Sequence, residues 1–193
     1  KREAGGKLRS IPVRLLFNDP GLNLRADYSL FDRDTGRPVC VGNGETSRRM
    51  GNEGVDAQPC PGPDTCRFAD GLCKVYARFN VVIVEGDDDT LGSFVLRTTS
   101  FNTIRTLAAR LQYFSAVSGR RLACLPLELK LRGKSTTMSY RTAIYYVDLV
   151  VRSGLTLEQA IEEARELAQR RQASGFDQAA LDEAARQGFA NGA

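Results

Sequence analysis

The residues of this sequence best suited to specific chemistry are cysteines, three of which fall within one short loop. Cys60, Cys66 and Cys73 are separated by five and six residues in a stretch rich in proline and glycine, and nineteen residues separate Cys40 from the first of them. Four thiolates suit Zn²⁺ because soft sulfur ligands accept tetrahedral coordination without redox chemistry. We therefore predict that Cys40, Cys60, Cys66 and Cys73 bind one zinc ion in a zinc knuckle that spans residues 40–73.

A site closed by four protein thiolates is structural, because a catalytic zinc keeps one position open for water or substrate. Two other interpretations stay open. The same thiols would also suit an iron–sulfur cluster, and they would equally suit reduced cysteines in a loop without metal. The fifth cysteine, Cys124, lies in an apolar segment and is predicted to be a core residue.

The sequence offers little else for catalysis, because it contains no histidine. This absence removes the commonest general base, the Ser–His and Cys–His nucleophile pairs and most catalytic zinc sites. Glu85 and the run from Asp87 to Asp89 are interpreted as a solvated hairpin tip, since a two-metal nuclease needs carboxylates that converge from separate elements. We predict that the protein is not an enzyme.

Positive charge is concentrated in the middle of the chain. Residues 1–100 hold fourteen Lys or Arg and fourteen Asp or Glu, residues 101–154 hold nine against two, and residues 155–193 hold four against seven. Cations spread along a surface bind polyanions, and aromatic side chains among them stack on single-stranded bases. The alternative is that these cations only solvate one face. The predicted surface for nucleic acid or a protein partner comprises Arg105, Arg110, Arg120, Arg121, Lys130, Arg132, Lys134, Tyr140 and Arg141.

Length and composition predict an ordinary soluble globular domain. The chain has 193 residues, of which 42% are hydrophobic, and this is enough for a core that does not depend on a metal. No apolar run reaches the roughly 18 residues that span a bilayer, and the first residues do not resemble a signal peptide. Five cysteines without a secretory signal favour metal binding over disulfides. We expect a cytoplasmic protein with neither a membrane nor a small-molecule substrate as its partner.

Hydrophobic periodicity predicts an α+β fold with an antiparallel or mixed sheet, one central basic helix, the cysteine-rich zinc knuckle loop and C-terminal helices. Residues 42–71 are almost free of aliphatic side chains and are predicted to contain no core element, so that a metal would be needed to order them. Strands are expected at residues 11–17, 31–41 (a hairpin interrupted at 34–38), 75–84, 93–99, 122–131 and 143–151.

Three helices are expected in the second half of the chain. The first runs from Ser100 or Asn102 to about Ser118, and the second runs from a capping box formed by Thr156 and Gln159 to near Ser174. The third, at 177–187, has few apolar residues and is expected to be a frayed tail. Residues 1–7 are predicted to be a disordered start or domain boundary, residues 8–154 the α+β core, and residues 155–193 a C-terminal helical segment.

Two segments that follow the cysteines carry a likeness to a known family. The run from Cys60 to Cys73 leads directly into residues 74–81, Lys-Val-Tyr-Ala-Arg-Phe-Asn-Val. Residues 92–100, Gly-Ser-Phe-Val-Leu-Arg-Thr-Thr-Ser, then lead into the basic helix at Ile104. In this order of features, about residues 8–152 resemble the recombination directionality factor-like proteins of phages and integrative elements.

Members of that family belong to mobile elements, and the best-known ones bind a large serine integrase and switch it from integration to excision without chemistry of their own. The resemblance implies a zinc-stabilised, non-catalytic accessory factor of DNA metabolism. Its partner would be a recombinase, an integrase or another DNA-processing protein, and DNA would be bound as well. The alternative is a single-stranded DNA-binding or annealing protein. A zinc-dependent hydrolase is a third candidate, which would require one open zinc position.

Overall fold

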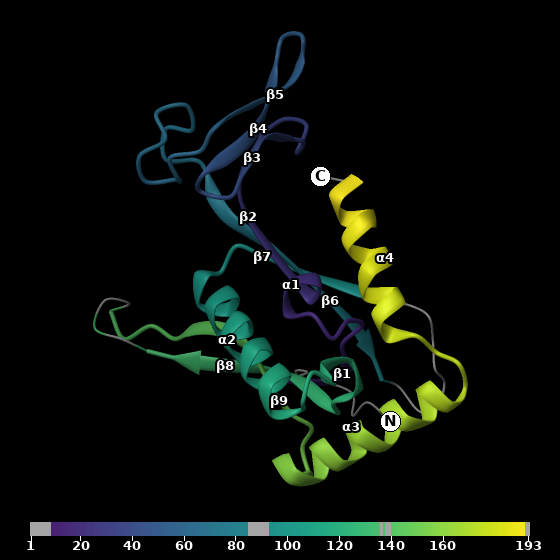
Figure 1. The fold of residues 1–193 in the computed structure, drawn as a ribbon. Coiled ribbons are helices and arrows are strands. Elements are labelled where there is room, and N and C mark those ends of the chain that lie inside the picture. The colour runs from purple at the N-terminus through teal and green to yellow at the C-terminus, as the bar shows by residue number, and fades with distance from the viewer. Residues whose placement is uncertain (1–8, 85–92, 136, 138–139, 192–193) are drawn as a thin grey trace.

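The described residues fold around one antiparallel β-sheet accompanied by four α-helices (Figure 1). The structure is a computed structural model, and it describes residues 9–84, 93–135, 137 and 140–191. The strands are β1 (Ser10–Arg14), β2 (Leu24–Phe31), β3 (Pro38–Gly42), β4 (Thr46–Gly51), β5 (Gly54–Pro59), β6 (Lys74–Ile83), β7 (Phe94–Thr98), β8 (Leu127–Lys134) and β9 (Ile144–Val151). The helices are α1 (Pro20–Asn23), α2 (Phe101–Val117), α3 (Leu157–Ala173) and α4 (Gln178–Asn191), with a 3₁₀ turn η1 (Leu122–Cys124).

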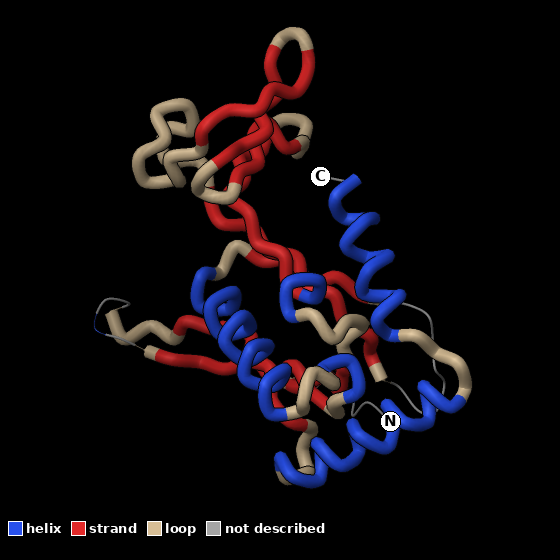
Figure 2. Tube along the Cα trace, viewed as in Figure 1, coloured by secondary structure: helices blue, strands red, loops and turns tan. Residues whose placement is uncertain are grey.

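The sheet has two ends, which the order of its strands defines. The order is β5-β4-β3-β2-β6-β1-β8-β9, and β7 pairs with β6 beside this path. Figure 1 shows α2 and α3 near the end formed by β1, β8 and β9, whereas β3, β4 and β5 extend away from these helices. Figure 2 shows the loops that follow β5 beside these outer strands. The cysteine loop is therefore built on the part of the sheet that α2 and α3 do not cover.

The hydrophobic core lies where α2 meets the sheet. Leu107 and Leu111 of α2 are 0% and 1% exposed and belong to one buried cluster with Val13 and Phe79 of the sheet. Burying side chains of this size contributes about 1.5–3 kcal/mol each. Ala160 of α3 is fully buried in the same cluster, so the segment after residue 154 shares the core of the strands that precede it.

The α+β class and several elements are confirmed where local chemistry specifies them. β6 and β7 pair in antiparallel orientation as the predicted central hairpin. The hydroxyl of Ser100 accepts a hydrogen bond from the Thr103 N–H at 3.3 Å and begins α2. Thr156 and Gln159 form the predicted capping box of α3. Residues 1–7 and the acidic tip at 85–89 lie outside the described residues.

The strands of the structure differ from the predicted ones. Residues 42–71 contain β4 and β5, which pair from Thr46 with Pro59 to Gly51 with Gly54. These strands are mostly exposed, so they lack the apolar alternation that marks a half-buried strand. Residues 122–131 do not form one strand, because η1 precedes Pro126, whose ring removes a backbone donor from the ladder. Cys124 is 4% exposed, which confirms its place in the core although it lies in the 3₁₀ turn.

The last helix packs against the core and is not the frayed tail that its composition predicts. Asp182 of α4 is 6% exposed, and its carboxylate accepts hydrogen bonds from the backbone N–H groups of Asn18 and Asp19 at 3.2 Å each. The ring of Phe189 meets that of Phe17 edge to face, with 6.2 Å between centroids. Contacts over more than 160 residues of sequence cannot be read from local periodicity, which explains the error.

Candidate functional site

The four predicted zinc ligands lie around one small pocket at the outer end of the sheet. Cys40 is in the middle of β3, Cys60 follows β5, and Cys73 precedes β6. These three residues and Cys66 are half-buried free thiols that line the same pocket of about 10 Å³. A space of this size holds about one water-sized particle. The fold therefore brings the four thiols together from segments that are far apart in the sequence.

Close backbone packing makes this arrangement possible. A Cβ atom at Gly42 would lie 2.7 Å from the Cys60 sulfur and 2.9 Å from Ser47 Cβ, so only glycine fits this position of β3 without a shift of its neighbours. The Cys60 N–H also donates a hydrogen bond to the Glu45 carbonyl at 2.8 Å. Gly71 has a positive φ of 75°, which supplies the turn before Cys73 at no steric cost.

The electrostatics of the pocket combine thiols with one guanidinium. Burial raises the pKa of the Cys73 thiol, and the other three cysteines raise it further. Arg49 lines the same pocket, where it stacks 3.8 Å from the centroid of the Phe68 ring. Its buried Nε has no hydrogen-bond partner among the described residues. A buried donor without an acceptor is costly, and the sulfur atoms of an anionic thiolate cluster are suitable acceptors.

The four cysteines are chemically suited to bind a metal, but their side chains are not positioned to hold one. As the side chains stand, the described part of the chain has no group of three or more Cys, Asp or Glu residues that could hold a metal ion. The four thiols in one shared pocket nevertheless are the donor set that a zinc–thiolate centre uses, and its sulfur atoms would give the unpaired Arg49 Nε an acceptor. An ion would be held only after the four thiols turn toward one common point.

The residues predicted to form a basic surface do not form one patch of free cations. Arg110 and Arg132 both bind the buried carboxylate of Asp148, at 3.0 and 3.2 Å. Lys130 pairs with Glu128 at 3.4 Å, and the Lys134 ammonium donates to the Asn102 side chain at 2.8 Å. Arg110, Arg132 and Lys134 hold the β8–β9 hairpin and α2 together, whereas Lys130 pairs within β8. These contacts leave less positive charge for a ligand.

The remaining predicted residues are divided between the two ends of α2. Arg120 and Arg121 follow its C-terminal end, whereas Arg105 is in its second turn and Tyr140 and Arg141 are in the β8–β9 connection. At 1.5 Å per residue, a helix of 17 residues separates its ends by about 25 Å. Tyr140 is 94% exposed. Arg105, Arg120 and Arg141 form no side-chain hydrogen bond or ion pair with another described residue.

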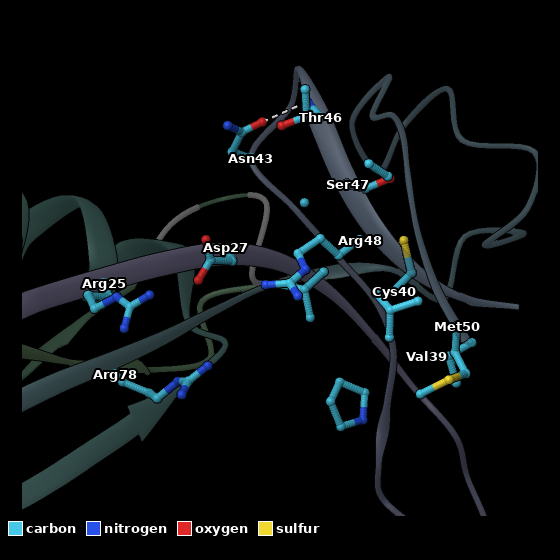
Figure 3. Close-up of a pocket in the computed structure, with 15 residues that line it drawn as sticks. Arg25, Asp27, Val39, Cys40, Asn43, Thr46, Ser47, Arg48, Met50 and Arg78 are labelled. Atoms are coloured by element: carbon cyan, nitrogen blue, oxygen red, sulfur yellow. Dashed lines mark hydrogen bonds between the residues drawn. The ribbon is translucent and has the colours of Figure 1, made fainter. Parts of the chain in front are cut away.

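The structure also shows a concave surface that the sequence does not reveal, and we call it the open face. It is the side of β2–β5 opposite the cysteine pocket, and it encloses about 610 Å³ (Figure 3). Val39 and Val41 of β3 and Ala57 of β5 contribute apolar surface. Met50 and Val55, which pair across β4 and β5, are 55% and 53% exposed. The charged residues in its lining are Arg25, Asp27, Arg48 and Arg78.

These arginines belong to strands whose charges are invisible to a search for cationic runs. Arg25 and Arg78 are 53 residues apart in the chain, yet they are direct partners across β2 and β6. The signal available in the sequence was the alternation of side chains between the two faces of each strand, which places each arginine on one face. Only the register of the sheet shows that they face each other.

In the described part of the chain, no helix is both long and apolar enough to cross a membrane.

Comparison with known proteins identifies a family. No curated protein and no solved structure matches this chain. The model of the family described as Gp3-like, recombination directionality factor-like, matches residues 1–152, which carry β1 to β9, the cysteine pocket and the open face. Because the match covers well over half of the sequence, this chain belongs to the recombination directionality factor-like family.

Proposed function

We propose that this protein is a non-catalytic accessory factor of a phage or another mobile element, and that it acts by binding the recombinase of that element. Membership of the family supports a role in phage DNA recombination. The observation that carries the docking role is the open face, where Met50 and Val55 expose more than half of their surface side by side. Exposed apolar side chains rimmed by charge are typical of protein-binding surfaces.

A reconstituted recombination reaction tests this role. The purified chain is added to the recombinase of the same element and its attachment-site DNA, and the integration and excision products are counted. We expect the chain to shift the products toward excision and to co-elute with the recombinase. Changing Met50→Glu and Val55→Glu together should weaken binding at least about tenfold, because charges replace apolar contacts at the centre of an interface.

The matched control for this test is Tyr113→Glu, which places a charge on a 48% exposed tyrosine of α2, at the end of the sheet away from the open face. It should leave binding and product ratio within about twofold of the wild type, as expected for a surface change away from an interface. Absence of any effect of the wild-type chain on the recombinase, or equal losses in both variants, would refute the docking role.

The cysteine pocket has a structural part in this proposal. With their protons lost, Cys40, Cys60, Cys66 and Cys73 would provide a closed set of four ligands for Zn²⁺, which would tie β3, the end of β5 and the start of β6 together. Arg49 would then offset part of the net negative charge of the thiolates. A closed site of this kind supplies rigidity and no nucleophile, which agrees with an accessory role.

DNA binding by the β8–β9 hairpin is the second candidate function. Figure 1 shows this hairpin projecting beyond α2. Tyr140 and Tyr145 are 94% and 64% exposed on it, and Arg141 has no partner among the described residues. Exposed aromatic rings next to cations suit single-stranded DNA, since bases stack on the rings while phosphates meet the cations. Arg132 and Lys134 are unsuitable for testing this, because both also hold the hairpin in place.

A double change of Tyr140→Ala and Arg141→Ala tests DNA binding without disturbing those contacts. If the hairpin binds single-stranded DNA, fluorescence anisotropy with a labelled oligonucleotide should show affinity falling at least about tenfold, since each stacked base contributes about 1–3 kcal/mol. Affinity of the wild type should also fall steeply between about 50 and 200 mM salt. Arg33→Ala, on the exposed β2–β3 turn, is the control. Wild-type protein that does not bind at about 50 mM salt would eliminate this candidate.

A further inference from the structure

Three arginines form a continuous row across neighbouring strands on the outer surface of the sheet. Arg25 of β2 is the direct partner of Arg78 of β6, and Arg78 is the direct partner of Arg97 of β7. Neighbouring strands are about 4.7–4.9 Å apart, and like charges directly opposite each other destabilise a sheet. Among the described residues, none of the three forms an ion pair. Among the residues that the structure describes, the positive charges of this row are therefore not neutralised by an ion pair.

The row adjoins the apolar floor of the open face. Arg25 and Arg78 line it together with Arg48, so its lining has three arginines and one carboxylate, that of Asp27. In the view of Figure 3 these four charged groups gather on one side, with Val39 and Met50 on the other. The open face thus offers a cationic half and an apolar half to the same ligand.

We infer that the open face binds an acidic amphipathic segment of a partner protein, whose carboxylates pair with Arg25, Arg48 and Arg78 while its apolar side chains cover Met50 and Val55. This inference rests on the proposed docking function and specifies the chemistry of the partner. Arginine is well suited to this role, because its planar guanidinium binds a carboxylate through two parallel hydrogen bonds.

The lining favours a polypeptide over nucleic acid. Val39, Met50, Val55 and Ala57 are aliphatic, and the residues that line the open face include no aromatic side chain on which a base could stack. Phosphates would satisfy the arginines but would leave the aliphatic floor uncovered. A segment with acidic and apolar residues satisfies both halves.

The direction of the arginine row favours a helical segment that lies across the strands. Acidic residues three or four positions apart on a helix face are about 5–6 Å apart, close to the strand spacing that separates Arg25 from Arg78. In an extended segment aligned with the sheet, side chains on one face are about 6.6 Å apart along the strand direction, so they would not follow the row.

Binding of two synthetic helical peptides to the full chain tests the inference. Both peptides have one leucine face, and they differ only in carrying glutamate or glutamine beside it. In titrations followed by NMR or anisotropy, the glutamate peptide should bind at least about tenfold more tightly than the glutamine peptide at low salt. Its affinity should fall at least about tenfold in the Arg25→Glu, Arg78→Glu variant, since attraction becomes repulsion.

The control variant is Arg33→Glu, Arg37→Glu, which changes net charge equally on the exposed turn between β2 and β3. It should retain binding within about twofold, as for charges outside an interface. Loss of folding is separated from loss of charge by the single change Arg78→Glu, which places a carboxylate between Arg25 and Arg97 and should keep or raise the melting temperature while it weakens binding of the glutamate peptide. Thermal denaturation of each variant measures this directly.

Three outcomes would overturn the inference while leaving the docking function intact. The first is equal binding of the glutamate and glutamine peptides. The second is an Arg25→Glu, Arg78→Glu variant that binds both the glutamate peptide and the recombinase as the wild type does. A single-stranded oligonucleotide that displaces the peptide in the wild type and loses affinity in this variant would also overturn it, by assigning the row to phosphates. The chain could instead have no effect in the recombination reaction and still bind the glutamate peptide more tightly than the glutamine peptide. That result would refute only the docking function.

Discussion

Replacing Cys60 with serine is expected to remove bound zinc and unfold the outer strands β3, β4 and β5. Serine cannot supply a soft thiolate ligand, and structural zinc sites in zinc-finger peptides contribute about 10–16 kcal/mol of apparent binding free energy. Elemental analysis should find about one zinc per wild-type chain, as expected for a closed four-thiolate site, and none in the variant. Hydrogen exchange should show lost protection in the outer strands and retained protection in α2.

The composition of the outer strands explains why the loss should be this large and this local. Among the residues of β3 to β5, only Gly42 and Ser47 are buried, and neither has an apolar side chain of any size. Hydrophobic burial therefore contributes little there, whereas the large buried cluster around Leu107 lies at the other end of the sheet. Without an ion, few contacts would offset the conformational entropy that is lost when about twenty residues become ordered.

Cys124→Ala is the control for this prediction. It removes a buried thiol of the core, far in sequence from the loop, so it should lower the melting temperature modestly and leave the zinc content unchanged. A wild-type chain that is fully folded and free of zinc would contradict the prediction. An iron content of several atoms per chain, with the colour of a cluster, would replace zinc by the iron–sulfur alternative that uses the same thiols.

The sequence predicted those features of the fold that depend on neighbouring residues. The cap of α2 at Ser100, the capping box of Thr156 and the β6–β7 hairpin were all readable, because each is specified within a few residues. The β4–β5 hairpin was missed because exposed strands carry no apolar alternation. Local patterns therefore give the elements that contribute to the core and overlook those outside it.

The candidate sites also show that local sequence patterns do not reveal which residues lie close together in the fold. The four cysteines could be grouped from their spacing, and the fold does place them around one pocket. The cationic residues 105–141 appeared to be a binding surface, yet Arg110 and Arg132 are committed to Asp148, whose burial no composition reveals. Conversely, Arg25 and Arg78 seemed unrelated because their proximity exists only through strand register.

Changing Asp182→Ala is expected to release α4 from the body of the protein. The carboxylate accepts the N–H groups of Asn18 and Asp19 and the side-chain amide of Gln178 at 2.8 Å. Its removal leaves two backbone donors without their acceptor, which should lower the free energy of unfolding of the docked helix by about 2–4 kcal/mol. Hydrogen exchange over residues 178–189 measures the release.

Two further variants separate this effect from a general loss of charge or helicity. Glu183→Ala removes a neighbouring carboxylate that is exposed and whose only ion pair with a described residue is to Arg186, so exchange should stay within about twofold of the wild type. Asp182→Asn retains one oxygen acceptor and should give an intermediate rate. Unchanged protection in Asp182→Ala would show that the other contacts of α4 suffice to dock it, among them Phe189 with Phe17 and Arg186 with Asp19 at 3.1 Å. Arg25 stacks 4.6 Å from the Phe189 ring, so release of α4 should also free this arginine. The glutamate peptide should therefore bind more tightly to Asp182→Ala than to the wild type.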